Sequence, residues 1–359
     1  MSAVPTPHLT LRPPTGWSSL NVGELWRFRD LMWTLGQRDV KLRYKQTVLG
    51  AAWVVFQPLL GAGIFTFVFG FLGGMADENA AVPYFLITYA GMVAWTAFNA
   101  TVTKASASLV ANSALVSKVY FPRAILPAST MFSTLLDLLV SLAVLTLMLA
   151  AFGIVPGWQV LLLPVWIGLL IMLALGVGMA AASLNVMYRD IGYIMPVAMQ
   201  MLLYLSPIGF TVAAVSAKLP AWAERIYLLN PLAPLLEAVR WSILGRAQAN
   251  AAPQAVSVDV ASAQATEAIA QAGAALDAAK VGLADATDVT PEAVHAMSQA
   301  AEAMTRTTAA VEQAAGLATP ASIDVPWLAV VYASAVCVAV FLAGYAWFRR
   351  FERRFADVI

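Results

Sequence analysis

The sequence predicts an all-α integral membrane protein: six transmembrane helices, an amino-terminal amphipathic interface helix, extracytoplasmic re-entrant helices and an alanine-rich helical hairpin insert. Composition is the first observation, because 60% of the 359 residues are hydrophobic and 11% are charged, too little polar surface for a soluble globule. The hydrophobic residues also form long uncharged runs. Lysine and arginine gather between alternate runs.

The composition also excludes several kinds of function. The formal net charge of +1 argues against a nucleic-acid coat protein, which needs a basic face. His8, His295 and Cys337 are too isolated along the chain to form a zinc site, so we expect no metal and no cofactor. No glycine is followed by lysine, which rules out a P-loop of the form GxxxxGK[ST].

The amino-terminal region divides into two parts. Residues 1–23 carry no cationic segment followed by an apolar core, so they predict a flexible tail rather than a cleaved signal peptide. Residues 24–45 place apolar side chains at helical spacing, with charges on the other faces. The stripe is Leu25, Phe28, Leu31, Met32 and Leu35. We expect a helix in the interface, its stripe among lipid headgroups.

Five uncharged runs are long enough to cross a membrane, and the longest holds two crossings. That run contains AFGIVPGWQ at 151–159, where a Gly/Pro turn and Trp158 indicate a break at the interface. The predicted spans are 46–76, 79–103, 127–152, 158–187, 191–217 and 325–348.

Cation positions predict the orientation. With both termini in the cytoplasm, fifteen of the 21 lysine and arginine residues fall in cytoplasmic segments, and the other six lie in one long outer segment. Long segments cross the membrane largely regardless of their charge, so those six do not oppose this orientation.

The outer segment between the last two spans has two parts. Residues 218–246 are apolar but interrupted by prolines, which predicts short re-entrant helices, with Glu237 and Arg240 spaced for one helix face. Residues 247–322 are rich in alanine, the best helix former, and predict a hairpin of 255–283 against 291–317. A low-complexity spacer without a binding role is the alternative for this insert.

Asp137 is the one clear ionisable residue inside the predicted spans. An intramembrane carboxylate is either a proton site or a polar contact between helices. Because no lysine or arginine falls in another predicted span, we expect Asp137 to bond to a hydroxyl such as Ser133 or Ser141.

Five separated motifs resemble one family when they are taken together. They are RDVKLRYKQTVLGAAWVVFQP from Arg38, LVSKVYFPRAILP from Leu115, LNVMYRDIGYIMPVAMQMLLYLSPIGF from Leu184, NPLAPLLEAVRWSILG from Asn230 and the terminal FERRFADVI. In this order and spacing, they resemble the membrane permease subunit of polysaccharide and polyol-phosphate ABC exporters, which move O-antigen, capsule or teichoic-acid chains. The insert at 247–322 departs from that pattern.

The resemblance implies a permease of the cytoplasmic (inner) membrane that acts as a homodimer with two copies of a separate ATPase, which binds ATP and magnesium. The substrate would be a lipid-linked polysaccharide. Residues 105–123 would form a coupling helix that docks on the ATPase, with Lys118, Tyr120, Phe121 and Arg123 as contacts. The loop with Arg189 and Asp190 is a second candidate for contact with the ATPase. The alternative for both segments is that their cations only fix the orientation of the spans in the membrane.

Three further sets of residues follow from the chemistry of such a substrate. Aromatic faces can hold a sugar chain that slides through a channel. The alternative is that the aromatic side chains in the spans serve only to pack the helices. The channel candidates are Trp53, Phe56, Phe65, Trp95 and Tyr204. The cations before the first span, where a lipid pyrophosphate would enter, are Arg38, Lys41, Arg43 and Lys45. The resemblance places gate helices at 218–246, which hold Trp222, Tyr227, Glu237 and Arg240.

Two other functions stay open at this point. A lipid or drug exporter permease would lack a channel for a long polymer. A membrane scaffold that presents the outer hairpin to a partner would have no transport activity. Residues 349–359 are expected to be a cytoplasmic tail.

Overall fold

The computed structural model describes residues 26–45, 50–74, 82–210, 212, 220–251, 327–352 and 355. In this part of the chain it contains helices and no strand. The elements are α2(Arg29–Lys45), α3(Gly50–Phe65), the π-helical η1(Thr66–Leu72), α4(Tyr84–Ala111), α5(Ser113–Lys118), α6(Ile125–Ala151), η2(Trp158–Leu162), α7(Leu163–Met187), α8(Ile191–Tyr204), α10(Ala221–Leu228), α11(Leu232–Ala251) and α14(Trp327–Phe351). The tail at 1–23 and nearly all of the predicted insert, with its hairpin, lie outside the described residues.

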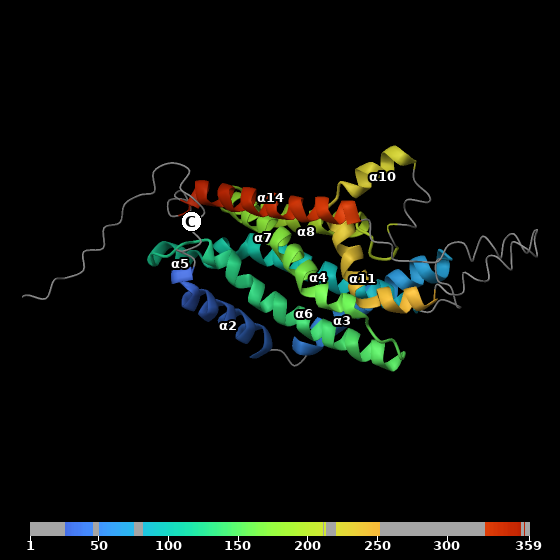
Figure 1. Ribbon diagram of the computed structural model, residues 1–359. Helices are drawn as coiled ribbons and strands as arrows, with labels where there is room; N and C mark the ends of the chain where they lie inside the picture. The colour runs from blue at the N-terminus through green and yellow to red at the C-terminus, as the bar shows by residue number, and fades with distance from the viewer. Residues whose placement is uncertain are drawn as a thin grey trace, which may run out of the picture.

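The long helices run side by side and form a bundle with two distinct ends (Figure 1). α5 and the carboxyl end of α14 lie at one end, which we name the α5 end. α10 and α11 lie towards the other, which we name the α11 end (Figure 1).

Five of the described helices are long and apolar enough to cross a membrane. They are Ala52–Leu72, Tyr84–Ala111, Ile125–Ala151, Trp158–Met187 and Trp327–Phe351. The predicted class, an all-α integral membrane protein, is therefore confirmed.

The region expected to form the fifth span, 191–217, has a different structure. α8 has 14 residues and ends at Tyr204, and residues 205–210 are not helical. Pro207 lacks a backbone donor and disfavours the helical conformation at Ser206, which explains the end of the helix there. A sixth crossing stays a prediction.

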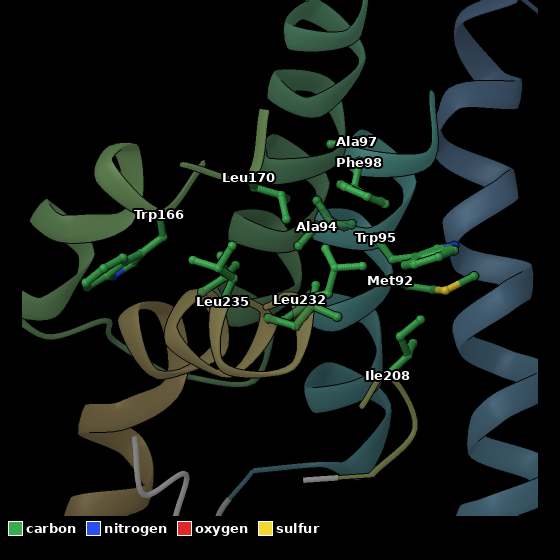
Figure 2. Packing of buried hydrophobic residues seen from close by; sticks show 14 of the residues in the cluster. Met92, Ala94, Trp95, Ala97, Phe98, Trp166, Leu170, Ile208, Leu232 and Leu235 are labelled. Carbon is green, nitrogen blue, oxygen red and sulfur yellow. The ribbon is translucent and has the colours of Figure 1, made fainter. Parts of the chain in front are cut away.

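α4 lies at the centre of the bundle, in contact with α3, α6, α7, α8 and α11. Its side chains form much of the main hydrophobic core, together with Leu232 and Leu235 of α11 and Leu170 of α7 (Figure 2). Figure 2 also shows Trp95 lying between α4 and α3. Because most of its surface is buried, α4 is the scaffold against which both ends of the bundle are positioned.

Glycines bring α7 close to its two neighbours. A Cβ added at Gly344 of α14 would lie 2.1 Å from the backbone oxygen of Gly176. A Cβ at Gly178 would lie 2.6 Å from Cβ of Ala105 in α4. Small residues allow membrane helices to pack at such short distances, and here they join α4, α7 and α14 through close contacts.

Two elements at the α5 end differ from their predicted form. α4 continues to Ala111, beyond the predicted end of the second span at residue 103, so the predicted coupling helix 105–123 is divided between α4, α5 and a turn. The interface helix packs on α6, with the rings of Trp33 and Phe132 5.3 Å apart. The described part of its apolar stripe packs on protein, since Leu35 is buried among residues of the α5 end and Phe28, Leu31 and Met32 contact the same cluster.

Candidate functional site

A cluster of charged side chains joins three helices near the α5 end. Asp137 of α6 accepts a hydrogen bond from Arg43 of α2, with Nη1 2.6 Å from Oδ2. It also binds Lys104 of α4, whose Nζ lies 3.3 Å from the same oxygen and 2.9 Å from Oγ of Ser133. The expectation that Asp137 has no cation on another helix was wrong, because α4 extends beyond residue 103 and brings Lys104 into the helical region.

The four cations proposed for the lipid pyrophosphate do not share one environment. Arg38 is held by Asp39 and by Asn112, with Nη2 3.0 Å and 2.8 Å from the two oxygens. Arg43 belongs to the Asp137 cluster, and Lys41 is exposed. The side chain of Lys45 lies outside the described residues. Among the described residues, Asp137 therefore binds two cations, Arg43 and Lys104.

Residues 113–124, which connect α4 to α6, form what we name the connecting segment. Lys118 and Tyr120 are exposed, and Tyr120 keeps 73% of its surface accessible. Phe121 is 4% exposed and packs inward, and Arg123 is half-buried. The four predicted coupling residues therefore divide into an outer pair and an inner pair.

The predicted second coupling loop also lies on the surface. Arg189 and Asp190 are exposed between α7 and α8. Asn185, at the end of α7, donates a hydrogen bond of 3.1 Å to the backbone oxygen of Ser106 in α4. This bond fixes the end of α7 against the last turns of α4, so the loop has a defined position.

Residues of the carboxyl terminus bind the inner side of the connecting segment. Glu352 accepts a hydrogen bond of 2.8 Å from the backbone N–H of Arg123, and the Arg123 guanidinium donates to the backbone oxygen of Glu352. Phe355 is fully buried in the same place. Sequence reasoning assigned no role to Glu352 or Phe355, although both belong to the FERRFADVI motif; their partners are more than 200 residues away.

The predicted channel aromatics fall into two groups. Phe65 and Trp95 are buried in the main hydrophobic core, as packing residues are. Trp53, Phe56 and Tyr204 are exposed on α3 and α8. Tyr204 stacks on Phe65 with ring centroids 6.5 Å apart, which links the end of α8 to the first predicted span.

Three of the four predicted gate residues meet near the α11 end. Arg240 and Glu237 form an ion pair with Nη1 3.3 Å from Oε2, and their side chains are 0% and 1% exposed. Nη1 of Arg240 also donates a hydrogen bond of 3.0 Å to the backbone oxygen of Phe210, in the non-helical stretch after α8. Tyr227 approaches this pair from α10, whereas Trp222 is exposed.

Burial dominates the electrostatics of this group. It raises the pKa of Glu237, and the neighbouring Arg240 guanidinium opposes that rise by favouring the carboxylate. Burial likewise raises the pKa of Tyr227, so its phenol keeps its proton. Gly91 of α4 lies against Arg240, since an added Cβ would be 3.1 Å from Nε. Arg240 thus occupies a fitted position between α4, α11 and the end of α8.

Comparison with known proteins places this arrangement in a family. The chain is 29% identical over 220 residues to the O-antigen export system permease protein RfbA of Klebsiella pneumoniae, which covers 60% of this chain and 80% of that protein. It is 26% identical over 215 residues to the protein of the same name from Myxococcus xanthus, with the same coverage of each chain. The family model described as ABC-2 type transporter matches residues 30–244, more than half of the 359 residues. The chain therefore belongs to the ABC-2 type transporter family.

Proposed function

We propose that this protein is the permease subunit of an ABC exporter that moves a lipid-linked polysaccharide across the cytoplasmic membrane. The observation that carries this proposal is the family match over residues 30–244, together with relatives named as O-antigen export permeases along 220 residues. Energy would come from a separate ATPase subunit, since the sequence contains no P-loop. Two copies of each subunit would form the complex, with ATP and magnesium bound by the ATPase.

The proposed orientation puts the α5 end in the cytoplasm. Seven described cations belong to elements of that end, namely Arg38, Lys41, Lys118, Arg123, Arg189, Arg349 and Arg350, against Arg225, Arg240 and Arg246 on α10 and α11. Lysine and arginine are enriched in cytoplasmic loops, so their collection at one end supports this orientation and two cytoplasmic termini.

The ATPase would dock on the exposed half of the connecting segment. Lys118 and Tyr120 offer a cation and an exposed aromatic ring, and Arg189 with Asp190 adds a second charged loop. Aromatic and charged side chains of this kind are common anchors at protein interfaces. Double substitution of Lys118→Ala and Tyr120→Ala should release the ATPase during purification, whereas Arg27→Ala on the interface helix should not.

The lipid pyrophosphate would bind beside the charged cluster of α2, α4 and α6. Lys41 is exposed there, and Arg43 and Lys104 place two more cations beside it. A dianionic headgroup at the membrane surface favours such a cationic site. Replacing Arg38, Lys41, Arg43 and Lys45 with glutamine should abolish export while membrane insertion and ATPase binding persist. Replacing Arg27 and Arg29 with glutamine is the control for a loss of positive charge elsewhere in the same region, and normal export by the fourfold variant would contradict the site.

The polymer would pass along the exposed aromatic face of α3 and α8 in the homodimer. Trp53, Phe56 and Tyr204 present large rings on this face, and flat aromatic surfaces bind sugars without fixing them. Tyr227, Glu237 and Arg240 would hold the gate at the far end, through the bond from Arg240 to the end of α8.

One experiment tests the whole proposal. Cells that lack this chain should accumulate a glycan still attached to its lipid carrier on the inner side of the membrane, and a plasmid copy should restore export. The tagged protein should also co-purify with an ABC ATPase. Accumulation of a lipid or a drug instead of a glycan would favour the first alternative, and an unchanged glycan with no ATPase would favour a scaffold.

A further inference from the structure

We propose that Glu352 and Phe355 fasten the connecting segment to the carboxyl end of α14, so that a force on that segment moves α14 and the centre of the bundle with it. The inference rests on the proposed function in one respect, namely that an ATPase supplies the force. Glu352 is a positioning residue in this scheme, because it acts through Arg123 and touches neither substrate nor nucleotide.

The polar half of the fastening is a hydrogen bond from a distant part of the chain to the turn that precedes α6. α6 begins at Ile125, and its own N-cap residue, Ala124, offers no side-chain acceptor. Oε1 of Glu352 accepts the hydrogen bond from the backbone N–H of Arg123, just before the first turn, at 2.8 Å. The first N–H groups of a helix lack internal partners and attract negative charge, so a carboxylate is well suited to this place.

Two arginines hold Glu352 in position for this bond. Nη1 of Arg349 lies 2.7 Å from Oε2 of Glu352, one turn earlier on α14. The side chain of Arg123 donates to the backbone oxygen of Glu352. Arg123 and Glu352 thus make two hydrogen bonds to each other, each between a side chain of one and the backbone of the other. Neither residue can move away without breaking both.

The apolar half of the fastening lies beside these bonds. Phe355 is 0% exposed, and its ring meets that of Phe348 at 5.3 Å in an edge-to-face arrangement. Val116 and Phe121 of the connecting segment belong to the same buried cluster. The aromatic side chain therefore fills the space between α14 and the connecting segment, and separating the two would expose it.

The connecting segment presents opposite properties on its two sides. Tyr120 is 73% exposed, whereas its neighbour Phe121 is 4% exposed. The outer side is thus available to a partner subunit, and the inner side is already committed to the carboxyl terminus. A push on the outer side would reach Phe121 and Arg123 directly through the backbone.

The rest of the path is rigid because it runs through backbone contacts. Gly344 and Gly176 bring α14 and α7 together with no side chain between them, since an added Cβ would lie 2.1 Å from a backbone oxygen. Gly178 lets α7 approach α4 with only a methyl group between the backbones, since an added Cβ would lie 2.6 Å from Cβ of Ala105. Closely packed backbones cannot absorb a displacement as flexible side chains do. A shift of α14 therefore has to move α7 and α4.

The first experiment compares Glu352→Ala with Arg350→Ala in the full complex. Arg350 is exposed on the same turn of α14, so its loss controls for a changed charge at this end. For Glu352→Ala we expect normal membrane insertion and ATPase co-purification, but a fall in glycan export per ATP hydrolysed of about tenfold, the size of a typical coupling between sites. Glu352→Gln keeps an oxygen acceptor for the Arg123 N–H and should restore much of the export. A parallel fall in protein level and export, with their ratio unchanged, would overturn the proposal.

A cross-link tests whether the two parts move together. The double variant Arg123→Cys, Glu352→Cys removes the native bonds, and the one native cysteine, Cys337, is buried. Export should be low in the reduced protein and should recover when a short thiol cross-linker joins the two positions. If the cross-link blocks export instead, the segment has to separate from α14 during transport, and the proposal fails.

A third measurement needs no ATPase, which separates this inference from the proposed function. In the purified permease, amide hydrogen exchange at residues 119–124 should be about tenfold faster in Glu352→Ala than in Arg350→Ala, because local opening follows the lost contacts. Equal exchange rates would contradict the fastening. Failure of the unmodified permease to bind any ATPase would contradict the proposed function alone.

Discussion

The two groups of charged residues in the bundle differ in how they are built. At the α5 end, Arg43, Lys104 and Asp137 come from three helices, and the cation side chains keep 32% and 29% of their surface accessible. At the α11 end, Glu237 and Arg240 lie one turn apart on α11, and neither has more than 1% accessible. The first group has partly exposed cations around a buried carboxylate, whereas the second is closed and pairs one cation with one carboxylate.

This difference indicates different tasks. Partly exposed charges remain hydrated, so they cost little and can exchange their partners for an anionic ligand. Fully buried charges lose their hydration, which the mutual attraction repays only when geometry and hydrogen bonds are good. Among the described residues, Nε and Nη2 of Arg240 find no hydrogen-bond partner. The buried pair therefore has a high desolvation cost, and it fixes α11 against the non-helical stretch that follows α8.

The largest expected effect comes from breaking the buried pair. Arg240→Met leaves Glu237 buried without its cation and removes the bond to Phe210. We expect a loss of about 3–5 kcal/mol in the free energy of unfolding, the usual cost of an uncompensated buried charge. The apparent melting temperature of the detergent-purified protein, followed by its elution profile after heating, measures this loss.

The matched control removes both charges together. The double variant Glu237→Leu, Arg240→Met should recover most of the lost stability, because a well-packed apolar pair often replaces a buried ion pair without cost. It should still export poorly, since the bond to the end of α8 is missing. A double variant as unstable as Arg240→Met would contradict the view that desolvation dominates here.

A smaller effect is expected at the open group. Asp137→Asn weakens the contacts to Arg43 and Lys104, but both cation side chains are already partly exposed. We expect a loss of about 1–2 kcal/mol, in the range of a few charge-assisted hydrogen bonds. Asp39→Asn, which affects the exposed pair with Arg38, is the control and should change stability by less than about 1 kcal/mol. A loss at Asp137 equal to that at Arg240 would remove the distinction between the two groups.

Much of the fold could be predicted from the sequence, because a chain that crosses a membrane has to form long uncharged helices. Uncharged runs and Gly/Pro breaks located five of the long helices, including the division at 151–159 that separates α6 from α7. The spacing of Glu237 and Arg240 predicted that they share one helix face, and in the structure they form an ion pair there.

The errors come from long-range contacts and from local helix ends. A charge usually ends a predicted span, so Lys104 was placed outside the second span and its partner on α6 was missed. The fifth span was predicted from an uncharged run, and that criterion ignores Pro207, which explains why α8 ends at Tyr204. The contact between Arg123 and Glu352 spans 229 positions in sequence, and no periodic pattern encodes such a distance.

The smallest expected effect tests how completely the buried group at the α11 end is satisfied. The hydroxyl of Tyr227 is buried near Glu237 and Arg240 without a hydrogen-bond partner among the described residues. Removing an unpartnered hydroxyl breaks no hydrogen bond. Tyr227→Phe should therefore change the free energy of unfolding by less than about 0.5 kcal/mol, or raise it slightly. Thermal unfolding in detergent measures the change.

Tyr84→Phe is the matched control, because the hydroxyl of Tyr84 donates to the backbone oxygen of Gly209 in the same region. Its loss should cost about 0.5–1.5 kcal/mol, the net value of one hydrogen bond. If Tyr227→Phe lowers the free energy of unfolding as much as Tyr84→Phe does, the Tyr227 hydroxyl has a hydrogen-bond partner beyond the described residues. The polar atoms of the group at the α11 end would then be as fully hydrogen-bonded as those of the charged group of α2, α4 and α6. If only Tyr84→Phe is costly, the buried group tolerates unmet polar atoms, which is the property expected of a gate contact that has to open.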